Sequence, residues 1–144
     1  MNLKFAFAVN SHNTFEKRHF GEADKFLIFE SKDNNLLLIN ELENIYKDFD
    51  EQKYGLPKKG VVISKYLLNH GVKVIVSQQF GRNIKEINKY FIPIVVYFET
   101  IESVIKALSE KLQWINEELN KTTCEYKLFK IKSGILKINV EEYE

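Results

Sequence analysis

The chain has 144 residues, a length that favours one compact domain over two. Its composition, 44% hydrophobic and 28% charged, is that of a soluble globular protein. A single cysteine, Cys124, excludes a disulfide framework and a metal site built of cysteines alone, which favours a reducing compartment. The formal net charge of +1 provides no general attraction to nucleic acid or to an anionic membrane. Because no apolar run approaches the roughly 20 residues of a membrane span, we expect a cytoplasmic protein.

Three short apolar segments come first along the chain, and their spacing predicts a meander of β-strands. Residues 3–9 (LKFAFAV), 25–30 (KFLIFE) and 36–42 (LLLINEL) each have the length and composition of a strand. The sequence KDNN predicts a turn, so the second and third strands form a hairpin. Residues 10–18 are a polar loop, and residues 43–60 are interpreted as a long connection.

Helices and strands alternate after this connection. Residues 61–71 have helical spacing and end at Gly71, which suits a left-handed C-cap. Residues 72–77 form a buried strand. Residues 83–91 and 92–98 repeat the pattern of a helix followed by a strand.

A long helix and a hairpin complete the chain. Thr100 caps a helix whose apolar side chains recur every three or four residues as far as Leu119. Residues 126–140 predict a lysine-rich β-hairpin turning at Ser133 and Gly134. The apolar surface of this C-terminal part exceeds what one small sheet covers, so we expect a homodimer. The alternative is that the hairpin folds back onto the protein's own helix.

This order of elements predicts an α/β layer sandwich in which helices cover both faces of the sheet. We expect residues 3–9 and 72–77 to lie side by side at its centre. Ligands of open α/β sheets bind at the carboxyl ends of such strands. The loops that leave these ends, residues 10–24 and 77–83, are therefore the candidate binding region, and the first contains the sequence His-Phe-Gly at residues 19–21.

Taken in order, these segments resemble the dinitrogenase iron–molybdenum cofactor biosynthesis family, the NifX type that also forms the carboxy-terminal domain of NifB. LKFAFAVN is similar to the family's opening strand, and HFGEADKFLIFE to its His-Phe-Gly and the strand that follows. KKGVVISKYLLNHGVKVIV and FGRNIKEINKYFIPIVV are similar to its two segments of glycine loop, helix and strand. The resemblance covers residues 1–111 and leaves residues 112–144 as a helix extension and β-hairpin on the same domain.

The resemblance implies a three-layer sandwich with a ribonuclease H-like motif and a mixed five-stranded sheet in the order 3-2-1-4-5. It implies a non-catalytic protein that binds or carries the iron–molybdenum cofactor or an iron–sulfur cluster precursor, with cofactor-assembly proteins as partners.

The sequence departs from the family in the loop after residue 77. Two glycines of the family pattern are replaced by Gln78 and Gln79, and its proline by Arg82. Glycine lets the backbone approach a bulky ligand closely, and glutamine does not. The departure favours an alternative function: a family paralogue without cluster binding that acts as a protein-interaction module through its C-terminal extension.

The candidate site residues follow from these two loops. His19 is the predicted metal ligand because neutral imidazole is a common ligand, although such a turn also has a purely structural interpretation in which Gly21 adopts a special backbone angle. Gly81, Arg82 and Asn83 are predicted to enter a helix N-terminus, where backbone donors suit an anionic cluster; alternatively, Asn83 is an ordinary cap and Arg82 is solvated. The predicted cofactor-binding set is His19, Gly21, Gly81, Arg82, Asn83 and Asn10.

Catalysis is not expected. Two-metal phosphodiester chemistry needs clustered carboxylates at the central strand ends, and the segments LKFAFAVN and VKVIVS contain none. Cys124 has no partner cysteine and is interpreted as an idle thiol. Lysines and aromatic residues between 126 and 137 would permit binding of single-stranded nucleic acid, but the near-neutral net charge argues against it.

Overall fold

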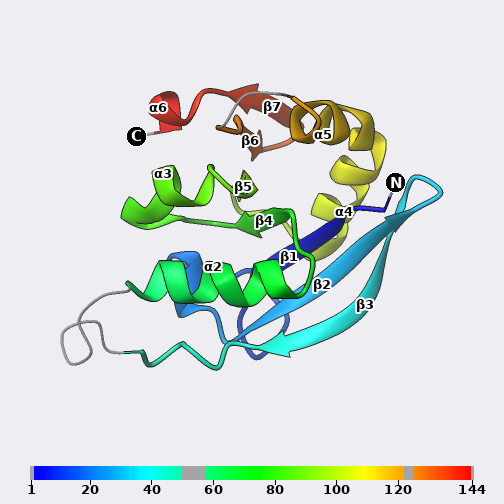
Figure 1. Cartoon of the computed structure of the whole chain (residues 1–144). Helices are drawn as coiled ribbons and strands as arrows, with labels where there is room; N and C mark the ends of the chain where they lie inside the picture. The colour runs from blue at the N-terminus through cyan, green and yellow to red at the C-terminus, as the bar shows by residue number, and fades with distance from the viewer. Residues whose placement is uncertain (1, 50–57, 122–124, 144) are drawn as a thin grey trace.

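The computed structural model describes residues 2–49, 58–121 and 125–143, and in this part of the chain seven strands form one mixed sheet in the order β3-β2-β1-β4-β5-β6-β7 (Figure 1). The strands are β1 (Lys4–Val9), β2 (Lys25–Lys32), β3 (Asn35–Glu43), β4 (Val74–Ser77), β5 (Ile92–Val96), β6 (Leu128–Ile131) and β7 (Ile135–Ile138). β1 pairs antiparallel with β2 and parallel with β4. The predicted order 3-2-1-4-5 and the predicted central pair are confirmed.

Helices cover both faces of this sheet. The helices are α2 (Lys59–Asn69), α3 (Ile84–Ile87), α4 (Ile101–Glu110), α5 (Leu112–Leu119) and α6 (Val140–Tyr143). Alternation along β1 separates two cores. Phe5 and Phe7 pack in one core with side chains of α4 and α5, whereas Ala6 and Ala8 pack in the other with side chains of α2, α3 and α6. The predicted three-layer sandwich is therefore confirmed.

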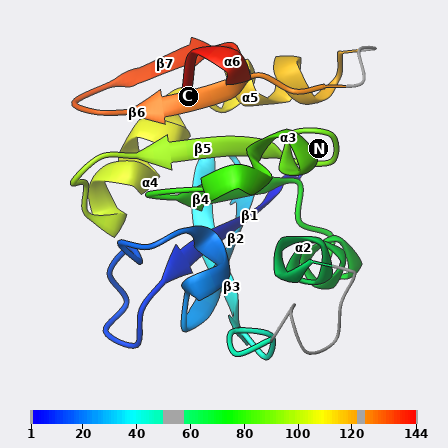
Figure 2. The ribbon, with the colours of Figure 1, turned by 90° about the vertical axis from the view of Figure 1, so that its left-hand side faces the viewer.

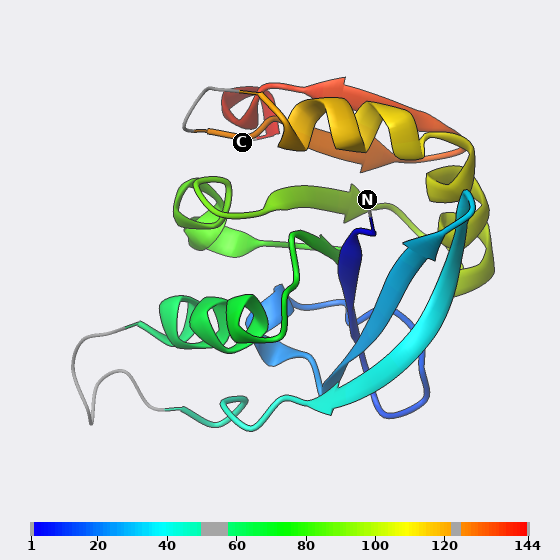
Figure 3. The ribbon, with the colours of Figure 1, turned by 45° about the vertical axis from the view of Figure 1, so that its right-hand side comes forward.

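The C-terminal hairpin continues the sheet beyond β5 (Figures 2 and 3). β6 pairs parallel with β5, with Phe129 opposite Ile94. Leu128 and Phe129 are fully buried. The hairpin also packs against the protein's own helix α5, as the alternative to a dimer interface expects: Phe129 and Ile131 share a core with Ile115. A parallel pair needs a crossover connection, and α4 and α5 provide it between β5 and β6.

The predicted long helix is interrupted. Lys111, at φ −126°, separates α4 from α5. The start of the helix is as predicted: the Thr100 hydroxyl accepts a hydrogen bond from the Ser103 N–H (3.0 Å), and the Ser103 hydroxyl accepts one from the Thr100 N–H (3.1 Å). This reciprocal arrangement is a capping box.

The predicted helix at residues 83–91 is reduced to a 3₁₀ turn, η2 (Gly81–Asn83), and the single turn of α3. Asn88 gives the physical reason. Its side chain is buried and donates from Nδ2 to the carbonyl of Tyr126 at 3.1 Å. The Asn88 carbonyl also accepts from the Tyr126 N–H at 2.9 Å, while the Ile92 N–H donates to the Lys73 carbonyl, so the bond that would continue the helix is not made.

The remaining differences concern element boundaries. α2 begins at Lys59 instead of Val61, so the predicted connection is shorter, and its residues 50–57 lie outside the described residues, as does Cys124. Gly71, at φ +79°, confirms the predicted left-handed C-cap. None of the helices within residues 2–49, 58–121 and 125–143 combines the length and apolar character that crossing a bilayer requires.

Candidate functional site

The His-Phe-Gly turn lies where the loop after β1 meets the loop after β4. His19 and Gln79 form a parallel bridge, in which the Phe20 N–H donates to the Gln79 carbonyl at 2.9 Å. The Gln79 side chain donates from Nε2 to the carbonyl of Lys17 at 3.0 Å. Backbone and side chain of Gln79 therefore join the two loops, as the topology at the carboxyl ends of β1 and β4 predicts.

Phe20 fixes the turn to the core. It belongs to a short 3₁₀ turn, η1 (Phe20–Glu22), and its side chain is fully buried, with its ring centroid 5.8 Å from that of Phe80. Its neighbour His19 points the other way, and 41% of the His19 side chain is exposed. The alternation of an anchored phenylalanine and an exposed histidine explains how a turn fixed to the core exposes the imidazole.

The two glycines serve different needs. Gly81 has φ +65°, a conformation that favours glycine. Space is not the reason, because a Cβ at Gly81 would lie 3.5 Å from the His19 Cβ, an ordinary contact distance. Gly21 is absent from the described residues with positive φ, and the predicted special backbone angle is wrong. Instead, a Cβ at Gly21 would lie 3.3 Å from the His19 imidazole atoms Nδ1 and Cε1. Gly21 makes room for the ring.

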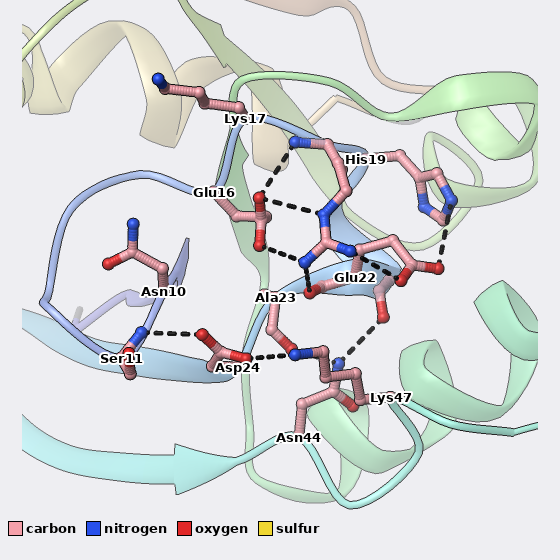
Figure 4. A network of polar contacts seen from close by, with 12 residues as sticks. Asn10, Ser11, Glu16, Lys17, His19, Glu22, Ala23, Asp24, Asn44 and Lys47 are labelled. Carbon is pink, nitrogen blue, oxygen red and sulfur yellow. Dashed lines mark hydrogen bonds and ion pairs between the residues drawn. The ribbon is translucent and has the colours of Figure 1, made fainter.

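Glu22 is the acidic group beside His19 (Figure 4). The His19 Nε2 atom lies 3.7 Å from Glu22 Oε1, and Lys59 Nζ donates to the same oxygen at 2.8 Å. The Lys59 hydrogen bond lowers the pKa of Glu22. Arg18 approaches the other carboxylate oxygen at 3.6 Å. Two cations thus neutralise the carboxylate next to the histidine.

Further polar contacts hold the loop in place. The Arg18 guanidinium donates to Glu16 Oε1 at 2.9 Å, and this hydrogen bond lowers the pKa of the largely buried Glu16 carboxyl. Asp24 accepts from the Ser11 N–H at 2.8 Å and pairs with Lys47. The Lys47 hydrogen bond likewise lowers the pKa of Asp24.

Asn44 binds the turn from the end of β3. Its side chain is buried and donates from Nδ2 to the carbonyls of Gly21 (3.0 Å) and Ala23 (2.8 Å). Sequence reasoning missed Asn44, Glu22 and Lys59 as parts of this site. Asn44 directly follows a strand and carries only the signal of an ordinary turn residue.

The structure brings together three of the predicted site residues, His19, Gly21 and Gly81. Arg82 is exposed beside them on η2, and the side chain of Asn83 lies outside the described residues. η2 leads directly into α3, so this loop enters a helix as predicted, but α3 is a single turn and its dipole is small.

Asn10 serves its own loop. Its Oδ1 accepts from the N–H groups of His12 (2.9 Å) and Thr14 (3.1 Å), and Figure 4 shows it on the far side of Glu16 from His19. The side chain of Asn10 therefore closes the turn that follows β1, at a distance from the imidazole.

The sequence matches the family described as dinitrogenase iron-molybdenum cofactor over residues 1–111. The chain belongs to this family. A search of curated proteins gives no match. Among solved structures, the chain is similar to a crystal structure from Methanocaldococcus jannaschii described, provisionally, as a dinitrogenase. The two share 18% identity at a TM-score of 0.56, over 77% of this chain and 91% of the other, and this similarity supports the fold alone.

The donors at the site limit what a member of the dinitrogenase iron–molybdenum cofactor family could hold here. Within residues 2–49, 58–121 and 125–143, no group of three or more histidine, cysteine, aspartate or glutamate side chains is placed to hold a metal ion. His19 and Glu22 alone do not complete the shell of a free ion, which takes four or more ligands. The irons of an iron–sulfur cluster share bridging sulfides, but their terminal ligands come from the protein and are usually cysteine thiolates. At this turn the His19 imidazole could provide one such ligand.

Proposed function

We propose that the chain is a non-catalytic binding or carrier protein for the iron–molybdenum cofactor or an iron–sulfur cluster precursor. It would act in the cytoplasm, in nitrogenase cofactor assembly or a process derived from it, and exchange its cargo with assembly proteins. Membership of the dinitrogenase iron–molybdenum cofactor family supports this proposal. The observation that carries it is the half-exposed His19 imidazole at the junction of two loops that Gln79 joins.

His19 would provide the protein ligand. Its Nε2 atom lies 3.7 Å from Glu22, which is beyond hydrogen-bonding distance, so this nitrogen is not committed to the carboxylate. Lys59 and Arg18 neutralise Glu22, and Arg82 is exposed beside the turn. An anionic cluster would therefore meet little repulsion at this place.

Anaerobic reconstitution with iron and sulfide tests the proposal. We expect a visible absorption band from bound cluster, together with bound iron that survives desalting. Both should diminish in His19→Ala. His12→Ala and His70→Ala are matched controls, because both histidines are exposed and neither belongs to the turn. Wild-type protein that remains colourless with iron–sulfide and with donated cofactor would contradict the proposal. Equal loss of the band in all three variants would remove the assignment to His19.

The second candidate is a family paralogue that binds no cluster and interacts with another protein through its C-terminal extension. One observation favours it: Gln79, at a glycine position of the family pattern, fills the loop junction with a side chain bonded to Lys17. Deleting residues 121–144 would remove the buried Leu128 and Phe129 and thereby disturb the core. A substitution at the surface tests partner binding without this effect. Leu136→Lys, at an exposed position on β7, should abolish partner capture while leaving the fold intact.

A further inference from the structure

The strand β3 forms an edge of the sheet whose first half, before the bulge at Ile39, carries no charged side chain. Among the residues that the structure describes, it is bonded to β2 on one side only, and no element follows it in the sheet (Figure 1). Its nine residues, NLLLINELE, contain no lysine, arginine or proline. Leu37, Leu38 and Ile39 stand 49%, 53% and 46% exposed in succession. A long apolar edge strand of this kind is a template for pairing with another strand.

The opposite edge is different. β7 has four residues, and its centre carries Lys137, whose ammonium lies 3.7 Å from the buried Glu118 carboxylate. Short length and lysine are two of the means by which sheets avoid edge pairing. The contrast indicates that β3 is the edge more open to pairing with another strand.

We propose that β3 pairs antiparallel with β3 of a second copy of this chain, about a two-fold axis perpendicular to the sheet. The register follows from the bulge in β3. Phe29 of β2 lies opposite Leu38, and Ile28 lies opposite Asn40, so Ile39 is an extra residue between them. With Leu37 on the axis, Leu36 of one copy lies opposite Leu38 of the other. Beyond the bulge, Asn35 of one copy lies opposite Asn40 of the other. In each opposed pair, both side chains therefore lie on the same face of the joined sheet.

Symmetry favours a second copy as the occupant of this edge. Pairing of β3 with β3 closes after two chains, whereas pairing of β3 with β7 would repeat without end and produce fibres. A two-fold interface uses the same surface of both copies, and here leucine side chains of one copy contact leucine side chains of the other across the axis.

Charge selects the antiparallel arrangement. A parallel arrangement would place Glu41 on Glu41 and Glu43 on Glu43. The antiparallel arrangement instead separates Glu41 and Glu43 of one copy from those of the other, at opposite ends of the paired strands. Opposite charges on neighbouring strands stabilise pairing, and like charges oppose it.

Sedimentation analysis over about 1–500 μM protein tests the interface. We expect wild type to form dimers, Leu37→Lys to be monomeric with its dissociation constant raised at least about 100-fold, and Leu136→Lys on the other edge to behave as wild type. A monomeric wild type overturns the proposal. So does a dimer that survives Leu37→Lys or is lost in Leu136→Lys.

Disulfide trapping tests the same interface independently, without the Leu37→Lys variant and any effect it has on folding. Leu37→Cys in a Cys124→Ser background leaves one thiol per chain, and residues paired directly across an antiparallel axis lie within disulfide range. Mild oxidation should link two chains through Cys at this position, and the matched Leu136→Cys variant should stay unlinked. Linking of the second variant but not the first would place the interface at β7 and refute the assignment to β3.

Discussion

Replacing Asn44 with alanine should destabilise the His-Phe-Gly turn, because the Asn44 side chain binds two of its carbonyl groups. Asn44 is 5% exposed. Its Nδ2 donates to the carbonyls of Gly21 and Ala23, and its Oδ1 accepts from the Tyr46 N–H at 3.2 Å. Alanine keeps the backbone and removes all three hydrogen bonds. A hydrogen bond contributes about 1 kcal/mol net, so the three together amount to about 3 kcal/mol. That is a large share of the roughly 5–15 kcal/mol that stabilises a domain.

Urea unfolding followed by circular dichroism measures this loss. We expect the midpoint to fall by roughly 1–2 M with an unchanged slope. Amide hydrogens of residues 19–24 should exchange faster than in wild type, because the turn opens more readily than the sheet. Asn69→Ala is the matched control: Asn69 is exposed near the end of α2, and we expect a change within about 0.5 kcal/mol. If Asn44→Ala costs no more than Asn69→Ala, the assignment of Asn44 as the support of the turn is wrong.

Three further predictions concern acid stability and backbone geometry. Hydrogen bonds from Arg18 hold the pKa of Glu16 below its ordinary 4.5, so the ionised carboxylate stabilises the fold at neutral pH, and this contribution is lost as the pH falls below 4.5 toward the folded-state pKa. Glu16→Gln should therefore flatten the acid side of the stability–pH curve, and an unchanged slope would contradict this account. Gly81→Ala forces a side chain onto a residue at φ +65° and should cost about 1–2 kcal/mol by urea unfolding, whereas no loss would show that the loop relaxes. Thr100→Ala removes the bond from the Ser103 N–H and should cost about 1 kcal/mol in thermal unfolding; a wild-type melting temperature would refute the role of the cap.

The sheet order could be predicted because its signals are local. Apolar runs, the Gly71 stop and the Thr100 cap are each readable within a few residues, and the carboxyl ends of β1 and β4 then place their loops together. His19, Gly21 and Gly81 were found by this route. The same logic failed at residues 84–91, since the periodicity continued while the buried Asn88 side chain bonded to a carbonyl far along the chain.

The supports of the turn could not be predicted because they join distant parts of the chain. Asn44 reaches Gly21 across 23 residues, and Lys59 reaches Glu22 across 37. Nothing in the local pattern distinguishes these side chains from solvated ones. The edge that the hairpin joins could not be predicted for a related reason: its alternation predicts a half-buried strand, and pairing with β5 is a long-range choice.

Pulsed electron paramagnetic resonance on cluster-loaded, ¹⁵N-histidine-labelled protein tests cargo binding by His19 most directly. Ligation predicts a ¹⁵N hyperfine coupling in the wild type and in His12→Ala, and its disappearance in His19→Ala. A loaded protein with no histidine coupling, or one whose coupling persists without the His19 imidazole, would contradict the proposed site.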